Sequence, residues 1–346
     1  MLSPRENALI AYRHGQPEYI PCFFTDIAMG QAAPFIERPM GSNAIGGRDG
    51  FDAWGVHWTY EAEMNASIPT PGRIMFDDIA DWRKYVKFPD LEAIDWEKQA
   101  AEDKYGSLVG VPKGMDPAAF CEGKLKVCMM IQGMFERMHS FMGFENALAA
   151  LMEDPDECFE YFSAMADFKI AYLKKVAQYY DFDVVEMHDD YGSQDRLFMS
   201  PETWRKLIKP NLKRIVDAAH ECGFIYQHHS CGHVEELIDD FIEMGMDAVD
   251  TWQAASNPHI AELKKDRLDK ITICGGFDNT NVLDNVNATP EQIQAEYRRA
   301  VDALAPGGSY VIFPITLTFG FVGPLLEEHF RYGMGFYADP AHRRQP

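Results

Sequence analysis

The second part of the chain alternates between short apolar runs and longer amphipathic stretches, and this alternation limits the fold more than any other feature. From residue 125 onward, runs that are apolar on both faces are separated by stretches with helical spacing. Short strands that are buried on both faces and joined through helices form a parallel sheet. A closed (β/α)8 barrel, the TIM barrel, fits this order best. We therefore expect an α/β protein with a single barrel domain over residues 1–346.

Capping signals set the boundaries of several expected elements. Ser3, Pro4 and Glu6 form a capping box with proline at the first helical position, and Thr289 opens a second box. The expected strands are residues 20–24, 125–131, 182–187, 225–228, 248–251, 271–274 and 309–312. The expected helices are residues 145–152, 155–180, 200–222 (kinked at Pro210), 234–244, 258–265, 289–304 and 324–337. The irregular residues 26–117, which include an aromatic stretch at 51–60, are expected to form an elaboration over the barrel mouth.

Charge and cysteine usage exclude several classes of protein. The chain has 32 basic and 54 acidic residues, and a net charge of -22 disfavours nucleic acid and anionic membranes as partners. Its seven cysteines are scattered without a disulfide framework, which favours a reducing cytoplasm. No apolar run reaches the roughly 18 residues of a membrane helix. Gly30, Gly41, Gly46 and Gly47 do not form a nucleotide-binding turn.

Polar residues follow almost every expected strand. The carboxyl ends of parallel strands in a barrel converge on one mouth, where catalytic residues of such proteins lie. The residues expected there are Asp26, Gln132, His188, Asp189, Asp190, Gln194, His228, His229, Cys231, Gln253, Asp278 and Asn279. Solvated strand ends also carry polar residues without any function, so each position retains a purely structural alternative.

His229 and Cys231 form the most specific pair in this set. An imidazole and a thiol two residues apart at a strand end, followed by Gly232, have the ligand types that bind zinc. We predict that both are metal ligands, with His228 as their inner neighbour. Cys274 lies within an apolar strand, so we interpret it as a buried thiol, with a second metal thiolate as the alternative.

The acidic pair at the end of the preceding strand is the second candidate. Asp189 and Asp190 follow His188, and such carboxylates can orient an imidazole, act as a general acid or base, or bind a metal. Their alternative is a solvated turn. We predict that these three residues are catalytic. The predicted substrate-binding residues are Asp26, Gln132, Gln194, His228, Gln253 and Asp278.

Four motifs together resemble the uroporphyrinogen decarboxylase superfamily, and within it the cobalamin-dependent methyltransferase branch. They are residues 189–194 (DDYGSQ), 200–205 (SPETWR), 228–232 (HHSCG) and 275–278 (GGFD). The resemblance implies a (β/α)8 barrel whose mouth faces a partner that carries a corrinoid. It also implies zinc at the mouth.

Two departures from the superfamily patterns narrow the expected activity. Residues 20–26 (IPCFFTD) lack the arginine with which decarboxylases hold a polycarboxylate tetrapyrrole. Residues 313–318 (FPITLT) lack the additional cysteine with which thiol-methylating members bind zinc. Zinc with one thiolate and harder ligands is a stronger Lewis acid, which suits an ether or phenolate oxygen.

We therefore predict methyl transfer from an O-methyl donor, most simply an aromatic ether, to the cobalt of a separate corrinoid protein. Zinc, or an acid drawn from His188, Asp189 and Asp190, assists the leaving oxygen. A metal-free decarboxylase or lyase on the same barrel is the first alternative. A barrel that only binds a corrinoid or small ligand and scaffolds its partner is the second.

Overall fold

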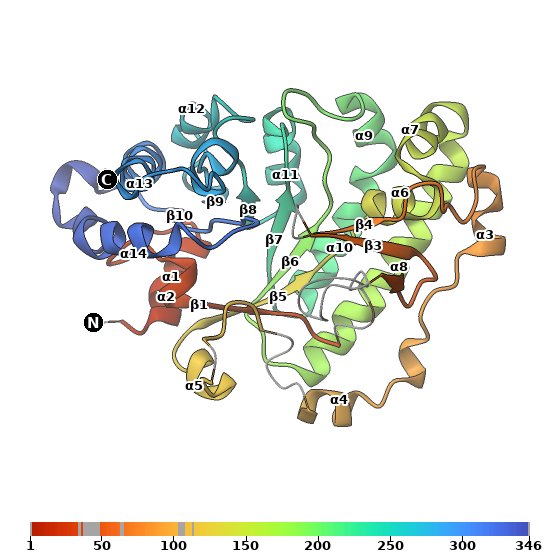
Figure 1. The fold of residues 1–346 in the computed structure, drawn as a ribbon, viewed down its shortest axis with the longest axis horizontal. Helices are drawn as coiled ribbons and strands as arrows, with labels where there is room; N and C mark the ends of the chain where they lie inside the picture. Colours follow the sequence, from red (N-terminus) through yellow and green to blue (C-terminus); the bar gives the residue numbers. More distant parts are fainter. Residues whose placement is uncertain are drawn as a thin grey trace.

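A curled parallel sheet forms the centre of the computed structural model, which describes residues 2–33, 36, 49–62, 66–102, 108–112 and 114–344 (Figure 1). Seven strands pair in the order β1-β5-β6-β7-β8-β9-β10. They are β1 (Ile27–Gly30), β5 (Leu125–Met130), β6 (Val184–His188), β7 (Ile225–Ser230), β8 (Ala248–Thr251), β9 (Thr272–Cys274) and β10 (Tyr310–Val311). A parallel bridge between Cys22 and Ile312 links the two edges of the sheet. The predicted barrel-type α/β fold is confirmed.

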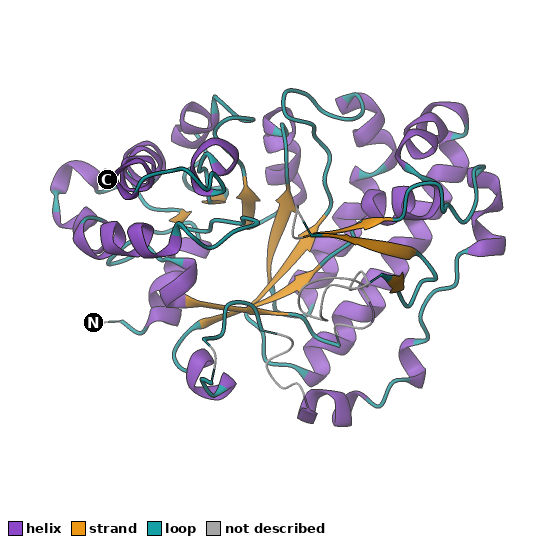
Figure 2. Ribbon diagram, viewed as in Figure 1, coloured by secondary structure: helices purple, strands orange, loops and turns teal. Residues whose placement is uncertain are grey.

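Helices surround this sheet, and the positions of most agree with the sequence pattern (Figure 2). They include α1 (Pro4–Tyr12), α6 (Met134–Met142), α7 (Phe144–Glu153), α8 (Pro155–Tyr179), α9 (Pro201–Leu207), α10 (Lys209–Glu221), α11 (Ile238–Met244), α12 (Ile260–Lys265), α13 (Pro290–Leu304) and α14 (Val322–Arg331). Shorter helices are α2 (Phe23–Asp26), α3 (Trp82–Tyr85), α4 (Trp96–Glu102) and α5 (Pro117–Cys121). The expected helix 200–222 is divided at Ile208 because Pro210 cannot donate a backbone hydrogen bond.

The first strand differs from its prediction. Cys22 pairs with the other edge of the sheet, but the chain then makes the helical turn α2 before β1 begins. The Asp26 carboxylate accepts a hydrogen bond from the Cys22 backbone N–H at 2.9 Å and one from the Tyr19 hydroxyl at 2.5 Å. A side chain that bonds the backbone locally competes with extended pairing. The strand therefore reaches the barrel mouth after Gly30, and not at residue 24.

The elaboration contains an antiparallel sheet of β2 (Gly50–Phe51), β3 (His57–Glu61) and β4 (Ala66–Pro69). Asp52 anchors it: this carboxylate accepts from the backbone of Trp54 and from the indole of Trp58, and it pairs with Arg137 of α6 at 2.7 Å. Both members of the ion pair are about 1% exposed. The elaboration is thus fastened to α6, the helix that follows β5. Gly41, Gly46 and Gly47 lie outside the described residues.

The barrel lumen has its own hydrophobic core, and α1 closes its lower end. The luminal cluster consists of Ala8, Ala11, Tyr12, Ile27, Met29, Leu125, Val127, Val184, Ala248, Cys274, Val311 and Phe313. The α1 backbone is tied to the amino-terminal ends of the strands, since the Thr272 hydroxyl donates to the Ala11 carbonyl at 2.7 Å. In the described part of the chain, no helix is both long and apolar enough to cross a membrane.

Candidate active site

Polar side chains from three neighbouring strands meet above this luminal core. Alternate residues of a strand face opposite sides of a sheet. With this period, β6 contributes Glu186 and His188, β7 contributes Gln227 and His229, and β8 contributes Asp250. All five are buried except His188, whose side chain is 16% exposed. Of the residues predicted at the mouth, His188 and His229 belong to this group, together with three residues that were not predicted.

Two carboxylate–imidazole pairs lie side by side in this group. Asp250 Oδ1 is 2.6 Å from His229 Nδ1, and Glu186 Oε2 is 2.9 Å from His188 Nε2. The two imidazole rings stack at 4.0 Å between centroids. Each ring keeps one nitrogen that its carboxylate does not occupy. That nitrogen is Nε2 in His229 and Nδ1 in His188.

Burial and neighbouring charges shift the ionisation of these groups. Burial raises the pKa of Glu186 well above its ordinary value, and the charge of Asp250 adds to this shift. Burial lowers the pKa of His188, with the neighbouring His229 adding to the effect. For His229, burial opposes the charged form, but Asp250 and Cys231 outweigh it and raise the pKa. The cluster thus favours a positive charge, or a metal ion, at His229.

Asp190, His229 and Cys231 form a group suited to a metal. One potential ligand atom from each lies within 4.8 Å of the others. His229 Nε2 is 3.4 Å from Cys231 Sγ and 3.8 Å from Asp190 Oδ1. With zinc bonds of about 2.0–2.3 Å, tetrahedral ligands are separated by roughly 3.3–3.6 Å. These residues therefore fit zinc with little movement, and Asp250 holds the far side of the imidazole as carboxylates do at zinc sites.

The first turn of α6 brings a further acid to this group. Asp189 accepts backbone hydrogen bonds from Met134, Phe135 and Glu136, at 2.9–3.2 Å, and a fourth from the Tyr191 hydroxyl. Burial raises its pKa to about 6. The Glu136 side chain has a pKa raised to about 8 by burial and by the charges of Asp190 and Asp189. The raised pKa favours the protonated form of Glu136 near neutral pH.

The close approach of β6 and α6 depends on a glycine. A Cβ atom at Gly133 would lie 2.3 Å from Asp189 Cβ and 2.6 Å from the His188 carbonyl. Only glycine lets the amino terminus of α6 reach the Asp189 carboxylate, which is a favourable position for an anion. This contact positions both the helix and Glu136.

Comparison with known proteins assigns the chain to a family. Residues 117–314, more than half of the 346 residues, match the family described as uroporphyrinogen decarboxylase (URO-D). The chain belongs to the uroporphyrinogen decarboxylase family. The superfamily predicted from the motifs is thereby confirmed.

Two methyltransferases are similar to this family member. Over 145 residues it is 26% identical to the methylcobamide:CoM methyltransferase MtbA of Methanosarcina mazei, and this match covers 40% of the chain and 38% of that relative. A solved structure described as a methyltransferase from Methanosarcina mazei aligns with a TM-score of 0.62 at 15% identity, over 96% of this chain and 99% of that one. The structural likeness is evidence for the fold alone.

Not all predicted site residues of this uroporphyrinogen decarboxylase family member meet at the lumen. His228 faces away from it, because its ring stacks on Tyr191 on the outer side of β7 and is fully buried. Asp26 is enclosed by the contacts of α2 described above. The structure brings neither residue to the luminal group, and their predicted role in substrate binding stays untested.

The remaining predicted substrate ligands lie on loops that follow the strands. Gln132 follows β5 with a positive φ of 61°, and its carbonyl accepts from Lys169 Nζ at 2.8 Å. Asp278 caps the helical turn Asn279–Leu283, and Gln253 accepts a hydrogen bond from Thr280 at 3.4 Å. Gln194 is exposed. These assignments also stay predictions.

Three residues of the luminal group, and Glu136 beside the metal group, were not predicted as site residues. Gln227 and Glu186 stand two positions before His229 and His188, so strand alternation would have identified both. Asp250 is the analogous residue of β8. Glu136 could not be found this way, because the sequence pattern did not reveal α6.

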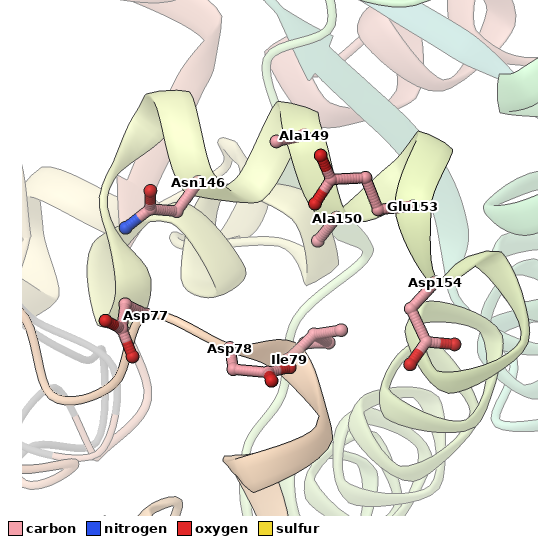
Figure 3. Close-up of a pocket in the computed structure, with 8 residues that line it drawn as sticks. All are labelled: Asp77, Asp78, Ile79, Asn146, Ala149, Ala150, Glu153 and Asp154. Carbon is pink, nitrogen blue, oxygen red and sulfur yellow. The ribbon is translucent and has the colours of Figure 1, made fainter.

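An acidic hollow of about 630 Å³ lies elsewhere, between α7 and the segment at residues 77–79 (Figure 3). It is lined by Asp77, Asp78, Ile79, Asn146, Ala149, Ala150, Glu153 and Asp154. Asp78 and Asp154 already cap helices, accepting from the backbone of Ala80 and Glu157. None of its lining residues belongs to the luminal group.

Proposed function

We propose that this protein transfers a methyl group from an O-methyl compound, most simply an aromatic methyl ether, to the cobalt of a separate corrinoid protein. The observation that carries the proposal is the group of Asp190, His229 and Cys231, which offers one thiolate, one imidazole and one carboxylate within 4.8 Å. Family membership and the similarity to a methylcobamide:CoM methyltransferase support methyl transfer.

The donor set favours an oxygen substrate. Asp190, His229 and Cys231 would hold zinc, and zinc bound there would supply a Lewis acid that stabilises negative charge on the departing oxygen. Residues 313–318 add no second thiolate. A centre with one thiolate stays harder than one with two, which favours an ether or phenolate oxygen over a thiol.

The protein's own acids can serve the same oxygen. When the methyl group leaves, the oxygen keeps the bond electrons and needs a proton or another positive partner. Burial and the charge of Asp190 raise the pKa of Glu136 to about 8, which favours its protonated form near neutral pH. We assign this role to Glu136 together with His188. Asp190 would act as a zinc ligand, and the bonds of Asp189 to α6 favour a positioning role for that residue.

An apolar wall beside the polar group suits the body of an aromatic donor. Phe23, Met129 and Ile315 pack against the apolar luminal cluster and are partly exposed. Phe23 meets Phe313 edge to face at 5.1 Å. An aromatic ring against this wall would place its ether oxygen toward β6–β8.

The decisive experiment uses the protein with a separately purified, reduced corrinoid protein. A panel of O-methyl, S-methyl and N-methyl donors is added, and cobalt methylation is followed in the absorption spectrum while the demethylated product is measured. We expect methylation with an aromatic O-methyl donor only when both proteins are present. Demethylation by the isolated chain without any corrinoid would disprove the proposed acceptor.

A metal-free lyase or decarboxylase is the second candidate, because the Glu186–His188 pair could move protons without a metal. Metal analysis of protein purified without chelators separates the two. Stoichiometric zinc favours methyl transfer, whereas turnover of a carboxylated substrate by zinc-free protein favours the lyase.

A further inference from the structure

A ladder of hydrogen bonds rises through the barrel from α1 to the two histidines, and Gln227 is its central member. The Tyr12 hydroxyl donates to Gln227 Oε1 at 2.6 Å. Gln227 Nε2 donates to Asp250 Oδ2 at 2.5 Å and to Glu186 Oε1 at 3.2 Å. All four side chains are fully buried.

The second oxygen of each carboxylate holds an imidazole. Asp250 Oδ1 contacts His229 Nδ1, and Glu186 Oε2 contacts His188 Nε2, at the distances given above. One amide thus determines where two carboxylates lie, and the carboxylates determine where two stacked rings lie. His229 Nε2 then faces Cys231 Sγ at 3.4 Å.

We propose that Gln227 is a positioning residue that presents His229 Nε2 to the metal, a role that rests on the metal-dependent function proposed above. With Asp250 accepting from Nδ1–H, the free lone pair of the neutral imidazole is on Nε2, which is the arrangement a ligand requires. Gln227 fixes the carboxylate that selects this tautomer.

The chemistry of its neighbours fixes the direction of the Gln227 amide. The carboxylates of Glu186 and Asp250 offer acceptors to the amide NH2 group, whereas the Tyr12 hydroxyl and the Cys274 thiol donate toward Oε1, at 2.6 and 3.7 Å. Rotating the amide by half a turn would place Oε1 against two carboxylates. A buried amide with all its partners matched in this way has one stable orientation.

A hydrocarbon side chain cannot replace this amide. A methionine of similar shape would leave two buried carboxylates without their shared donor, and they would move apart or toward the histidines. Tyr12→Phe is a milder change, because it removes only the hydroxyl that steadies the amide from below. Asn7 provides the control: it is a fully buried amide on α1 that bonds the backbone of Tyr19 and Glu18 and contacts none of the ladder residues.

The test compares Gln227→Met, Tyr12→Phe and Asn7→Leu in the full chain. Zinc affinity is measured by competition with a chromophoric chelator, and unfolding temperature by calorimetry. We expect Gln227→Met to weaken zinc binding roughly 10–100-fold, the usual cost of removing an outer partner of a metal ligand. Tyr12→Phe should weaken it by a smaller factor, and Asn7→Leu should lower the unfolding temperature without changing zinc affinity.

Each result decides the matter. Zinc-binding wild type with unchanged affinity in folded Gln227→Met would overturn the role of Gln227 while leaving the proposed function intact. If Gln227→Met does not fold, unchanged affinity in Tyr12→Phe has the same meaning. Equal losses of zinc affinity in Asn7→Leu and in the ladder variants would show that the loss comes from lower protein stability, which would also overturn the positioning role of Gln227. A wild-type protein that binds no zinc would overturn both proposals.

With donor and corrinoid protein, Tyr12→Phe should lower kcat and leave the donor KM unchanged.

Discussion

The two sides of the barrel lumen are built from the same kind of parallel strand but carry opposite chemistry. Above the apolar Val184 and Ala248 at the beginning of β6 and β8, the strands β6, β7 and β8 direct Glu186, His188, Gln227, His229 and Asp250 inward. The side formed by β1, β5 and β10 directs aliphatic, sulfur-containing and aromatic side chains inward, which include Ile27, Met29, Leu125, Val127, Val311 and Phe313. The polar side makes a network in which buried groups are paired, and the apolar side makes a surface.

The difference shows where the cost of buried charge has been concentrated. Charges that leave water are tolerated when each is paired and hydrogen-bonded. Because the buried polar groups lie on three adjacent strands, the Gln227 amide can bond two carboxylates, and each carboxylate can bond one imidazole. The facing side is then free to bind the apolar part of a ligand. Variants on each side should therefore change different measured quantities.

The largest effect should distinguish the two neighbouring acids. Asp190→Asn should lower turnover by about two to four powers of ten, because a carboxylate of the zinc group is lost from the reacting centre, with little change in unfolding temperature. Asp189→Asn should instead destabilise the fold by about 1–3 kcal/mol. The Asp189 carboxylate accepts from three backbone N–H groups of α6, and the amide would place an NH2 donor against some of them. Steady-state kinetics and calorimetry of both variants check this. Wild-type turnover in both would reduce the acids to a structural turn.

A buried charge outside the polar side should be costly. Burial lowers the pKa of Lys264 to about 7, and its Nζ donates to the Gly308 carbonyl. Below pH 7 both folded and unfolded chains are protonated and the cost of burying the charge is complete. As pH rises toward 10.5, only the unfolded chain stays protonated, so the cost disappears.

Lys264→Met should therefore stabilise the protein by roughly 2 kcal/mol at pH 7, after the loss of its hydrogen bond, and by almost nothing near pH 10. Unfolding temperatures at the two pH values provide the measurement. The exposed neighbour Lys265→Met is the matched control and should show no such pH dependence. A gain that is the same at both pH values would contradict the assigned cost.

Loss of the thiol should affect the metal more than the fold. Cys231→Ser should weaken zinc binding at least roughly tenfold, because a soft ligand is lost from the group with His229 and Asp190. Cys222→Ser, which changes a partly exposed thiol at the end of α10, should keep full zinc content. Elemental analysis of both variants decides the matter, and stoichiometric zinc in Cys231→Ser would remove Cys231 from the ligand set.

The smallest effect should come from the apolar side. Phe23→Ala removes a ring that meets Phe24 and Phe313 edge to face, and such contacts contribute about 0.5–1.5 kcal/mol. The KM for an aromatic donor should rise up to roughly tenfold, with zinc content unchanged. Phe330→Ala, an exposed ring on α14, provides the control. A fall in kcat with constant KM would show that Phe23 does not act by holding the donor.

The parts of the structure that rest on local pattern could be predicted, and the parts that rest on distant contacts could not. Strand and helix alternation located β5 to β10, and the spacing of His229 and Cys231 pointed to two of the three residues that could hold a metal. α6 was missed because Gly133 supplies no side-chain cap, and the residue that binds its first turn, Asp189, follows β6. The split first strand depends on Asp26 bonding its own turn. Neither contact has a sequence period.

Because α1 closes the lower end of the barrel, a ligand would reach the lumen from the mouth. Ala8, Ala11 and Tyr12 are fully buried in the luminal core, so α1 fills the end of the lumen beneath the histidines. A ligand that enters through the mouth must also leave through it. A large partner bound at the mouth would therefore retain a small ligand that already lies in the lumen. If a small ligand and a large partner both bind, this geometry imposes an order: the small ligand binds first and leaves last.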